Sequence, residues 1–170
     1  MTAGRLAPGE LAESIRASFA DVFEARGEVT LVVAAGELVD ALARLRGDEA
    51  LSFDFLSDVA ATDWLGREPR FWVAYHLHST THGHRLRVKV GLPGDDPRVP
   101  SVTALFPTAN WHEREVFDFF GVVFDRHPDL RRIELPDGWE TFPLRKDHPL
   151  SGVRTQYHGA FIPPPDERGL

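Results

Sequence analysis

The sequence predicts an α+β fold, in which helices pack on a mixed β-sheet in two layers. Several stretches of the first hundred residues alternate apolar with polar side chains, as half-buried strands do. Two other stretches repeat apolar residues every three or four positions, as amphipathic helices do. Proline is concentrated late, with 11 of the 13 prolines at Pro93 or beyond, which favours regular structure in the first part. The expected order is helix, two strands, helix and three strands, followed by one more helix and a long irregular C-terminal extension.

The segments of the first hundred residues differ in how clearly their apolar spacing indicates a helix or a strand. Leu38, Leu42 and Leu45 share one face of an expected helix. The last two strands are joined by a short polar loop and are expected to form a hairpin. Residues 51–64 begin as an alternating strand but continue apolar, so a helix is the alternative there. The predicted ranges are 10–20 and 36–46 for the helices, and 28–34, 51–64, 70–78 and 85–92 for the strands. Of the two strands expected before the second helix, only the one at 28–34 is given bounds.

The second half is expected to contain little regular structure. A short helix is predicted at Ser101–Phe106 and a longer one at 110–120. Residues 1–124 would form the α+β domain, including the longer helix, and residues 125–170 an extended, proline-rich segment. Compact domains rarely carry so long an irregular segment unless it has a function, so we expect it to wrap partner proteins. The Pro163–Pro165 run within it is typical of a polyproline-like conformation.

Composition argues against several classes of protein. The 170 residues are enough for one domain, and 42% hydrophobic with 11% aromatic residues indicates a folded chain. The net charge of −7 disfavours binding to nucleic acid, which needs a basic face. The absence of cysteine excludes disulfides, thiolate zinc sites and iron–sulfur ligation by this chain, and it fits a reducing cytosol. We expect no signal peptide and no membrane span, because no apolar run approaches the roughly 20 residues that a bilayer requires.

The stretch NWHEREVFDFFG at 110–121 has the clearest helix signals of the second half. Asn110 is a favoured N-cap, Glu113 would complete a capping box, and Gly121 is placed to end the helix. Four apolar residues share one broad face of this helix: Val116, Phe117, Phe119 and Phe120.

The charged residues of this helix allow three interpretations. Arg114, Glu115 and Asp118 lie opposite the apolar face, and Arg114 can pair with Asp118 four residues later. The first interpretation is a solvated face with local ion pairs, and the second is a docking surface for a partner. The third, an acid/base pair of Glu113 and Glu115, is disfavoured because residues two apart on a helix point to different sides.

The loop of the predicted hairpin is rich in histidine. His76, His78, His82 and His84 lie in the sequence HLHSTTHGH, and imidazole clusters can bind zinc or nickel. No acidic residue lies within this stretch, so solvated loop histidines are the expected case. A stand-alone metalloprotein that uses these histidines is kept as a remote alternative.

Two proline-containing segments of the extension carry cations, which are either solvated or paired with carboxylates of a partner. The first segment holds His127 with the cations Arg131 and Arg132, and the second holds the cations Arg145 and Lys146 next to the acid Asp147. No enzyme signature accompanies them: G-x-G-x-x-G, P-loop, G-x-S-x-G and H-E-x-x-H patterns are all missing from the sequence. Nothing therefore indicates independent nucleotide binding.

Three stretches resemble the sequence signature of one family. The run EREVFDFFG at 113–121, followed by HPDLRRI at 127–133, is similar to the signature of the C subunit, or 30 kDa subunit, of NADH:quinone oxidoreductase, respiratory complex I. FPLRKDHPL at 142–150 and DDPRVPSVT at 95–103 resemble two further runs of that family. The histidine hairpin and the residues after Leu150 are not matched.

The resemblance implies a two-layer domain in the peripheral arm of complex I, as a structural subunit without a catalytic site. Such a subunit holds no cofactor, while the complex carries FMN and iron–sulfur clusters and passes electrons from NADH to a quinone. The implied partners are other complex I proteins, especially the D subunit at the quinone site and the cluster-bearing B subunit. The implied location is peripheral, at the cytoplasmic face of the cell membrane, through the complex.

The resemblance also implies which residues matter. None is expected to be catalytic, cofactor-binding or metal-ligating, and the charged residues of the motifs are expected at subunit interfaces or in a structural role. They are Glu113, Arg114, Glu115, Asp118, His127, Arg131, Arg132, Arg145, Lys146 and Asp147. The alternative is the equivalent subunit of a related membrane complex that shares the motif, a group 4 hydrogenase or a ferredoxin- or F420-dependent dehydrogenase.

Overall fold

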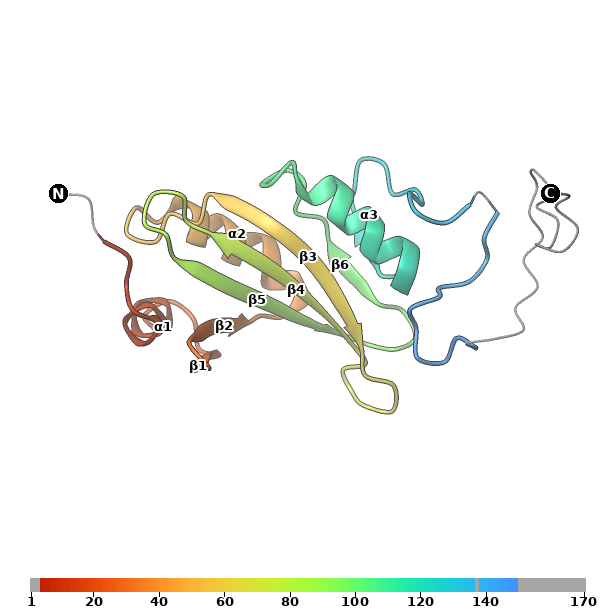
Figure 1. Cartoon of the computed structure of the whole chain (residues 1–170), viewed down its shortest axis with the longest axis horizontal. Helices are drawn as coiled ribbons and strands as arrows, with labels where there is room; N and C mark the ends of the chain where they lie inside the picture. The colour runs from red at the N-terminus through yellow and green to blue at the C-terminus, as the bar shows by residue number, and fades with distance from the viewer. Residues whose placement is uncertain (1–3, 137, 150–170) are drawn as a thin grey trace, which may run out of the picture.

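A five-stranded sheet and a separate pair of short strands organise the chain (Figure 1). The computed structural model describes residues 4–136 and 138–149. The elements are α1 (Pro8–Arg16), β1 (Val22–Ala25), β2 (Glu28–Val32), η1 (Ala35–Glu37), α2 (Leu38–Gly47), β3 (Phe55–Asp63), β4 (Phe71–His78), β5 (Arg85–Leu92), β6 (Arg98–Pro100), α3 (Ala109–Phe120) and β7 (Val123–Asp125).

The large sheet is mixed, as the sequence predicts. Its order is β1-β2-β5-β4-β3, in which only the β2–β5 pair is parallel. The α+β fold class is therefore confirmed, together with the hairpin of β4 and β5, whose register pairs Phe71 with Leu92 and His78 with Arg85. The two short strands β6 and β7 pair in parallel and flank α3 in the sequence.

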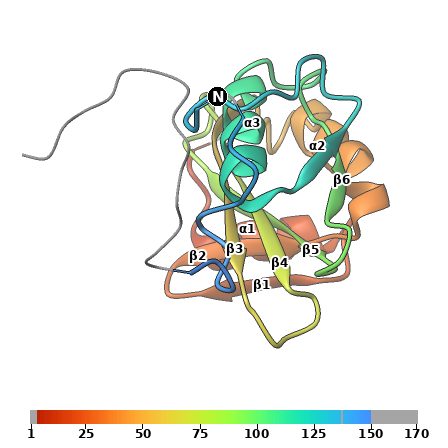
Figure 2. The ribbon, with the colours of Figure 1, turned by 90° about the vertical axis from the view of Figure 1, so that its right-hand side faces the viewer.

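Strict alternation gives β4 and β5 one buried and one partly exposed face. The buried face of β5 is formed by Leu86, Val88, Val90 and Leu92. Figure 1 shows α2 behind the sheet, and Figure 2, turned by 90°, shows it to the right of β3 and β4, whereas the opposite face of β3, β4 and β5 carries no helix. We call this opposite side the open face.

The three α-helices of the described residues contribute to one apolar core. Ile15 of α1, Leu42 of α2 and Val116 of α3 belong to the same buried cluster as the inward side chains of the sheet. Burying a side chain of this size stabilises the fold by about 1.5–3 kcal/mol. The core therefore fixes α3 against the sheet, and α3 in turn presents the charged motif residues.

The first helix is shorter than predicted. It ends at Arg16 and not at residue 20, and β1 then begins at Val22. Arg26 and Gly27 both have positive φ, 56° and 77°, and form the two-residue turn that joins β1 to β2. Arg-Gly is a weaker turn signal than Asn-Gly, which explains why two strands are expected here but the turn and the bounds of β1 are not predicted.

The predicted helix at Ser101–Phe106 is wrong. This stretch forms turns, with the N–H groups of Leu105 and Phe106 both donating to the carbonyl of Val102.

Residues 126–136 and 138–149 contain no helix or strand, in agreement with the predicted irregular extension. The rest of that extension, including the Pro163–Pro165 run, lies outside the described residues. No helix in the described part of the chain is long and apolar enough to cross a bilayer.

Candidate functional site

Glu113 is a buried anchor and not a helix cap. Its Oε1 accepts a hydrogen bond from the N–H of Val102 at 2.8 Å, and its Oε2 accepts one from the Ser101 hydroxyl at 2.7 Å. The predicted capping box with Asn110 is wrong, because α3 begins one residue earlier and Thr108 at the cap position makes no side-chain cap bond. Glu113 lies on the apolar side of the helix, so its carboxyl reaches the neighbouring chain segment and not its own backbone.

The surroundings of Glu113 shift the pKa values of buried groups toward their neutral forms. Burial raises the pKa of Glu113 to about 7 against the hydrogen bonds from Val102 and Ser101, which lower it. His127 lies with its Nε2 3.9 Å from the Glu113 carboxyl, and burial lowers its pKa. Its Nδ1 accepts from the N–H of Asp129 at 3.0 Å, so the proton is on Nε2, which donates to the carbonyl of Asn110 at 3.2 Å.

Tyr75 adds a third buried group near this carboxyl. The side chain is fully buried on β4, and its hydroxyl has no hydrogen-bond partner among the described residues. Burial, and then the charge of Glu113, raise the pKa of Tyr75 well above its ordinary value. The sequence does not single out Tyr75, because alternation alone marks it as one more core aromatic.

Asp118 is the second buried anchor on α3. Its Oδ2 accepts hydrogen bonds from three consecutive N–H groups, those of Ile133, Glu134 and Leu135, at 2.7–3.0 Å. Its Oδ1 accepts from Nη1 of Arg132 at 2.7 Å. Burial opposes ionisation of Asp118, but the hydrogen bonds from Leu135 and Arg132 outweigh it and hold the pKa below the usual range.

Of the interpretations left open, the solvated face is therefore wrong for Asp118, although its position opposite the apolar face of the helix follows from the helical period. The segment around Arg132 folds back over the end of α3 and covers the carboxylate. Arg114 does not pair with Asp118; its Nε donates to the carbonyl of Arg131 at 3.1 Å, and its guanidinium lies over the Trp111 ring.

Phe142 and Arg145 of the FPLRKDHPL stretch pack onto the end of the same helix. Gly121 ends α3 with φ 69°, as predicted, and a Cβ there would lie 2.6 Å from the ring of Phe142 and from Nη2 of Arg145. Nε of Arg145 donates to the carbonyl of Phe120 at 2.6 Å, and its guanidinium lies between the rings of Phe71 and Phe142. Glycine is needed at position 121 for both its backbone conformation and its lack of a side chain.

A third buried carboxylate, that of Asp63 at the end of β3, is not among the residues predicted from the sequence. Arg70 donates two hydrogen bonds to it, from Nε and Nη2, both at 2.8 Å. The N–H of Lys146 donates to the same carboxylate at 2.8 Å, and Nη2 of Arg70 lies 2.9 Å from Asp147. The hydrogen bonds from Arg70 are the first cause of the lowered pKa of Asp63. Asp63 and Arg70 bracket the β3–β4 loop, which is the sequence signal that could have paired them.

The remaining motif residues lie at the surface. Trp111 is 63% exposed and, with Arg114 and Glu115, forms a strip that we call the outer face of α3. Glu115 and the side chain of Lys146 make no ion pair within the described part of the chain. Arg131 is exposed and binds Asp129 through Nε and Nη2 at 2.6 and 2.7 Å.

The histidine stretch differs from the expected solvated loop, because His76 and His78 lie half-buried on β4 and His84 is buried. His84 is buried and not solvated: its Nδ1 accepts from the N–H of Leu6 at 3.3 Å, and its ring stacks on that of His82. Within residues 4–136 and 138–149, no group of three or more histidine or acidic side chains is arranged to hold a metal ion. This geometry gives no support to the histidine-based metalloprotein.

Three buried carboxylates, those of Glu113, Asp118 and Asp63, thus hold distant backbone segments against α3 and the sheet. The sequence family described as "Respiratory-chain NADH dehydrogenase, 30 Kd subunit" matches residues 31–154 of the chain. The chain belongs to this family. All ten candidate residues of the motifs lie within the matched range, so the fastening geometry is built from the region shared with the family.

Individual relatives agree with this membership. The C subunit of NADH-quinone oxidoreductase from Mycolicibacterium gilvum is 50% identical over 146 residues, which cover 84% of this chain. The chain spans 64% of that relative, less than two thirds of its length.

Two solved structures share the fold. A trypsin-resistant fragment of Nqo5 is 36% identical, with a TM-score of 0.63, and the match covers 72% of this chain and 98% of the fragment. A chain from the membrane-bound sulfane sulfur reductase, an archaeal respiratory membrane complex, has a TM-score of 0.72 and 24% identity, with coverage of 91% and 98%. At this identity the second likeness concerns the fold alone.

Proposed function

We propose that this chain is a non-catalytic structural and assembly subunit of a proton-translocating NADH:quinone oxidoreductase of the complex I type. In this role it lies in the peripheral arm, beside the quinone-site D subunit and near the cluster-bearing B subunit, at the cytoplasmic face of the membrane. The names of the relatives support the kind of complex. FMN, the iron–sulfur clusters, NADH and quinone are bound by other subunits.

One observation carries this proposal: the two motif carboxylates that α3 buries are engaged inside the chain. Glu113 and Asp118 are both fully buried and each accepts hydrogen bonds from backbone N–H groups. A general acid or base must reach a substrate, and these carboxylates are enclosed by the chain itself. Glu113 therefore holds the segment after β6, at Ser101 and Val102, and Asp118 holds the segment after β7.

The fastened segment leaves the outer face of α3 available for a partner. A large exposed aromatic residue next to an arginine and an acidic residue has the composition of an interface centre and its polar rim. Trp111, stacked beneath the guanidinium of Arg114 at 5.0 Å, is the aromatic anchor of this surface. Glu115 supplies a charge that no described residue neutralises.

The four cations expected to contact sister subunits divide into two groups. Arg132 and Arg145 make internal hydrogen bonds to Asp118 and to the carbonyl of Phe120, so their reversal would unfold this region as well as remove a contact. Arg131 and Lys146 are exposed. Lys146→Glu is the sharper test, because it leaves the Lys146 N–H bond to Asp63 intact.

The proposal is tested by mass spectrometry of the proteins that co-purify with the tagged full chain from its native host. We expect a quinone-site subunit, a cluster-bearing subunit and a flavin-containing NADH module. Recovery of the chain alone would overturn the proposal. Recovery with hydrogenase-type subunits and without the NADH module would favour the related membrane complex instead.

A further inference from the structure

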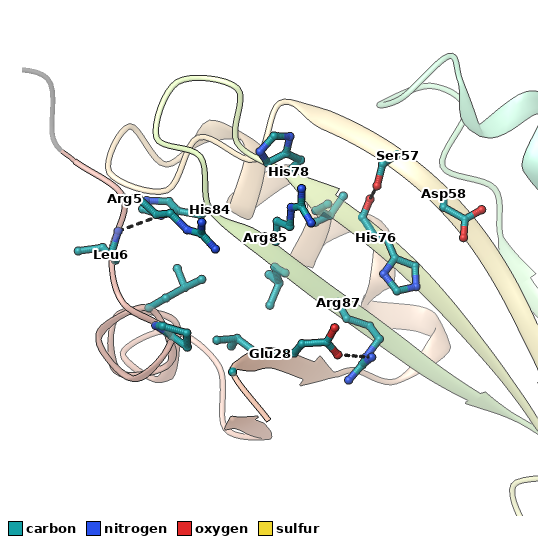
Figure 3. A pocket seen from close by; sticks show the side chains of 16 residues that line it. Arg5, Leu6, Glu28, Ser57, Asp58, His76, His78, His84, Arg85 and Arg87 are labelled. Atoms are coloured by element: carbon teal, nitrogen blue, oxygen red, sulfur yellow. Dashed lines mark hydrogen bonds and ion pairs between the residues drawn. The ribbon is translucent and has the colours of Figure 1, made fainter. Parts of the chain in front are cut away.

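A pocket lies where the N-terminal segment passes the open face of the sheet (Figure 3). Its volume is about 560 Å³. Arg5, Leu6 and Leu11 line one side, and side chains from β3, β4 and β5 line the other, among them His78 and Arg85. No residue of the family motifs at 113–121, 127–133 and 142–149 lines this pocket, so it is separate from the segment after β7 that Asp118 holds.

The pocket has more cations than the chain itself neutralises. Arg87 is paired with Glu28 at 2.9 Å and also donates to the Thr30 hydroxyl. Arg5 and Arg85 are exposed, and their guanidinium groups form no ion pair with any carboxylate of the described residues. A carboxylate of a bound molecule would therefore meet two arginines that need not give up an ion pair within the described residues to bind it.

The shape favours an extended occupant over a compact one. Figure 3 shows the labelled side chains distributed along the strands, with His78 and Arg85 at one end and His76 and Arg87 further along. Alternate residues on a strand are about 6–7 Å apart, which is also the spacing of alternate side chains in an extended peptide. A peptide lying along this face can therefore place successive alternate side chains against successive strand residues.

We propose that this pocket binds an acidic, partly apolar peptide segment of a sister subunit, with Arg5 and Arg85 as its carboxylate receptors. The inference rests on the proposed function, because it requires the chain to be part of an assembly. Leu6 and Pro8, which are half-buried, supply the apolar part of the contact. A large polyanion such as nucleic acid fits less well, because the whole chain carries a net charge of −7.

Photo-crosslinking in the assembled complex tests this inference. Benzoylphenylalanine replaces His78 in the tagged full chain, the complex is purified from the native host after irradiation, and the crosslinked peptide is sequenced by mass spectrometry. We expect a crosslink to a segment of another subunit that contains aspartate or glutamate. Arg85→Glu should lower the crosslink yield at least fivefold, whereas Arg126→Glu, an exposed arginine outside the pocket, should leave it within twofold.

The outcomes separate the two proposals. A complex that co-purifies normally but gives no crosslink, or gives one to a segment without carboxylates, would overturn the pocket assignment and leave the proposed function intact. A yield that Arg85→Glu does not change would do the same. Failure to co-purify at all would overturn both. Replacing the crosslinked acidic residue by lysine should restore the yield in the Arg85→Glu chain, as a charge exchange requires.

Discussion

Asp118 shows how one carboxylate can organise a segment that has no secondary structure of its own. Three successive N–H groups converge on a single oxygen, and Arg132 closes the other side. Backbone N–H groups in an irregular segment need partners, and a buried anion satisfies several at once. The sequence shows that Asp118 lies on the polar side of a helix, but not that later residues return to cover it, because that contact is set by the tertiary path.

Replacing Asp118 by asparagine should lower the free energy of unfolding by about 3 kcal/mol. The variant keeps the shape of the side chain but leaves Arg132 without its counter-charge and presents an amide N–H₂ to groups that are themselves donors. Urea denaturation of the full chain measures the effect. Glu115→Gln, on the exposed side of the same helix, is the matched control and should stay within about 0.5 kcal/mol. Equal stability of both variants would contradict the anchoring role of Asp118.

Glu113 should make stability depend on pH near neutrality. Its folded pKa is raised from 4.5 to about 7, so the protonated carboxyl is favoured in the folded state. The stabilisation is present at low pH and is lost as the pH rises through about 7, by up to about 3 kcal/mol. Urea denaturation at pH 5 and pH 8 should show the wild type losing more stability than Glu113→Gln, which cannot ionise. Identical pH dependence of the two proteins would show that Glu113 is not the titrating group.

At the scale of elements, the sequence predicts the sheet and its helices better than their ends. Helical period and alternation identify α2, β4 and β5 because these elements bury one regular face. The short strands β6 and β7 are only three residues long and have too little pattern to be recognised. The predicted start of α3 is misplaced because Asn110 is a good cap by residue type, whereas the helix begins in the turn before it.

The end of α3 is sensitive to a single methyl group. Gly121→Ala should destabilise the protein by about 2–4 kcal/mol, because φ is 69° and the new Cβ would meet Phe142 and Arg145 at 2.6 Å. Gly47→Ala at the end of α2 has open space and no positive φ, so it should be neutral or slightly stabilising. Thermal or urea unfolding of both variants provides the comparison, and a harmless Gly121→Ala would refute the close packing described here.

At the scale of the whole molecule, the three buried carboxylates connect the sheet, α3 and the C-terminal segment. Asp63 joins the end of β3 to Lys146, a residue 83 positions later in the chain. Family motifs draw attention to the two ends of this arrangement, but a sequence without alignment gives no reason to link Asp63 or Arg70 to them. The motif residues could therefore be chosen from the sequence, while their internal partners are visible only in the folded chain.

Loss of this long-range link should loosen the segment without unfolding the sheet. Arg70→Gln removes two hydrogen bonds to Asp63 and the ion pair with Asp147. Backbone hydrogen exchange of the peptide spanning residues 142–149 should accelerate at least tenfold, while that of β4 and β5 stays close to the wild-type rate. Arg67→Gln, in the same loop but without an ion pair among the described residues, is the control. Unchanged exchange in Arg70→Gln would mean that other contacts hold the segment.

The central claim is that the buried motif carboxylates Glu113 and Asp118 act inside the chain while the outer face of α3 meets a sister subunit. The most direct measurement is the amount of partner subunits that co-purifies with the tagged full chain, by quantitative mass spectrometry, for Trp111→Ala and Glu115→Lys. Asp40→Lys, an exposed acid on α2, is the matched charge reversal. The account predicts at least a fivefold loss of partners for the two α3 variants, unchanged free energies of unfolding, and wild-type recovery for Asp40→Lys. Wild-type recovery of partners with both α3 variants would contradict it.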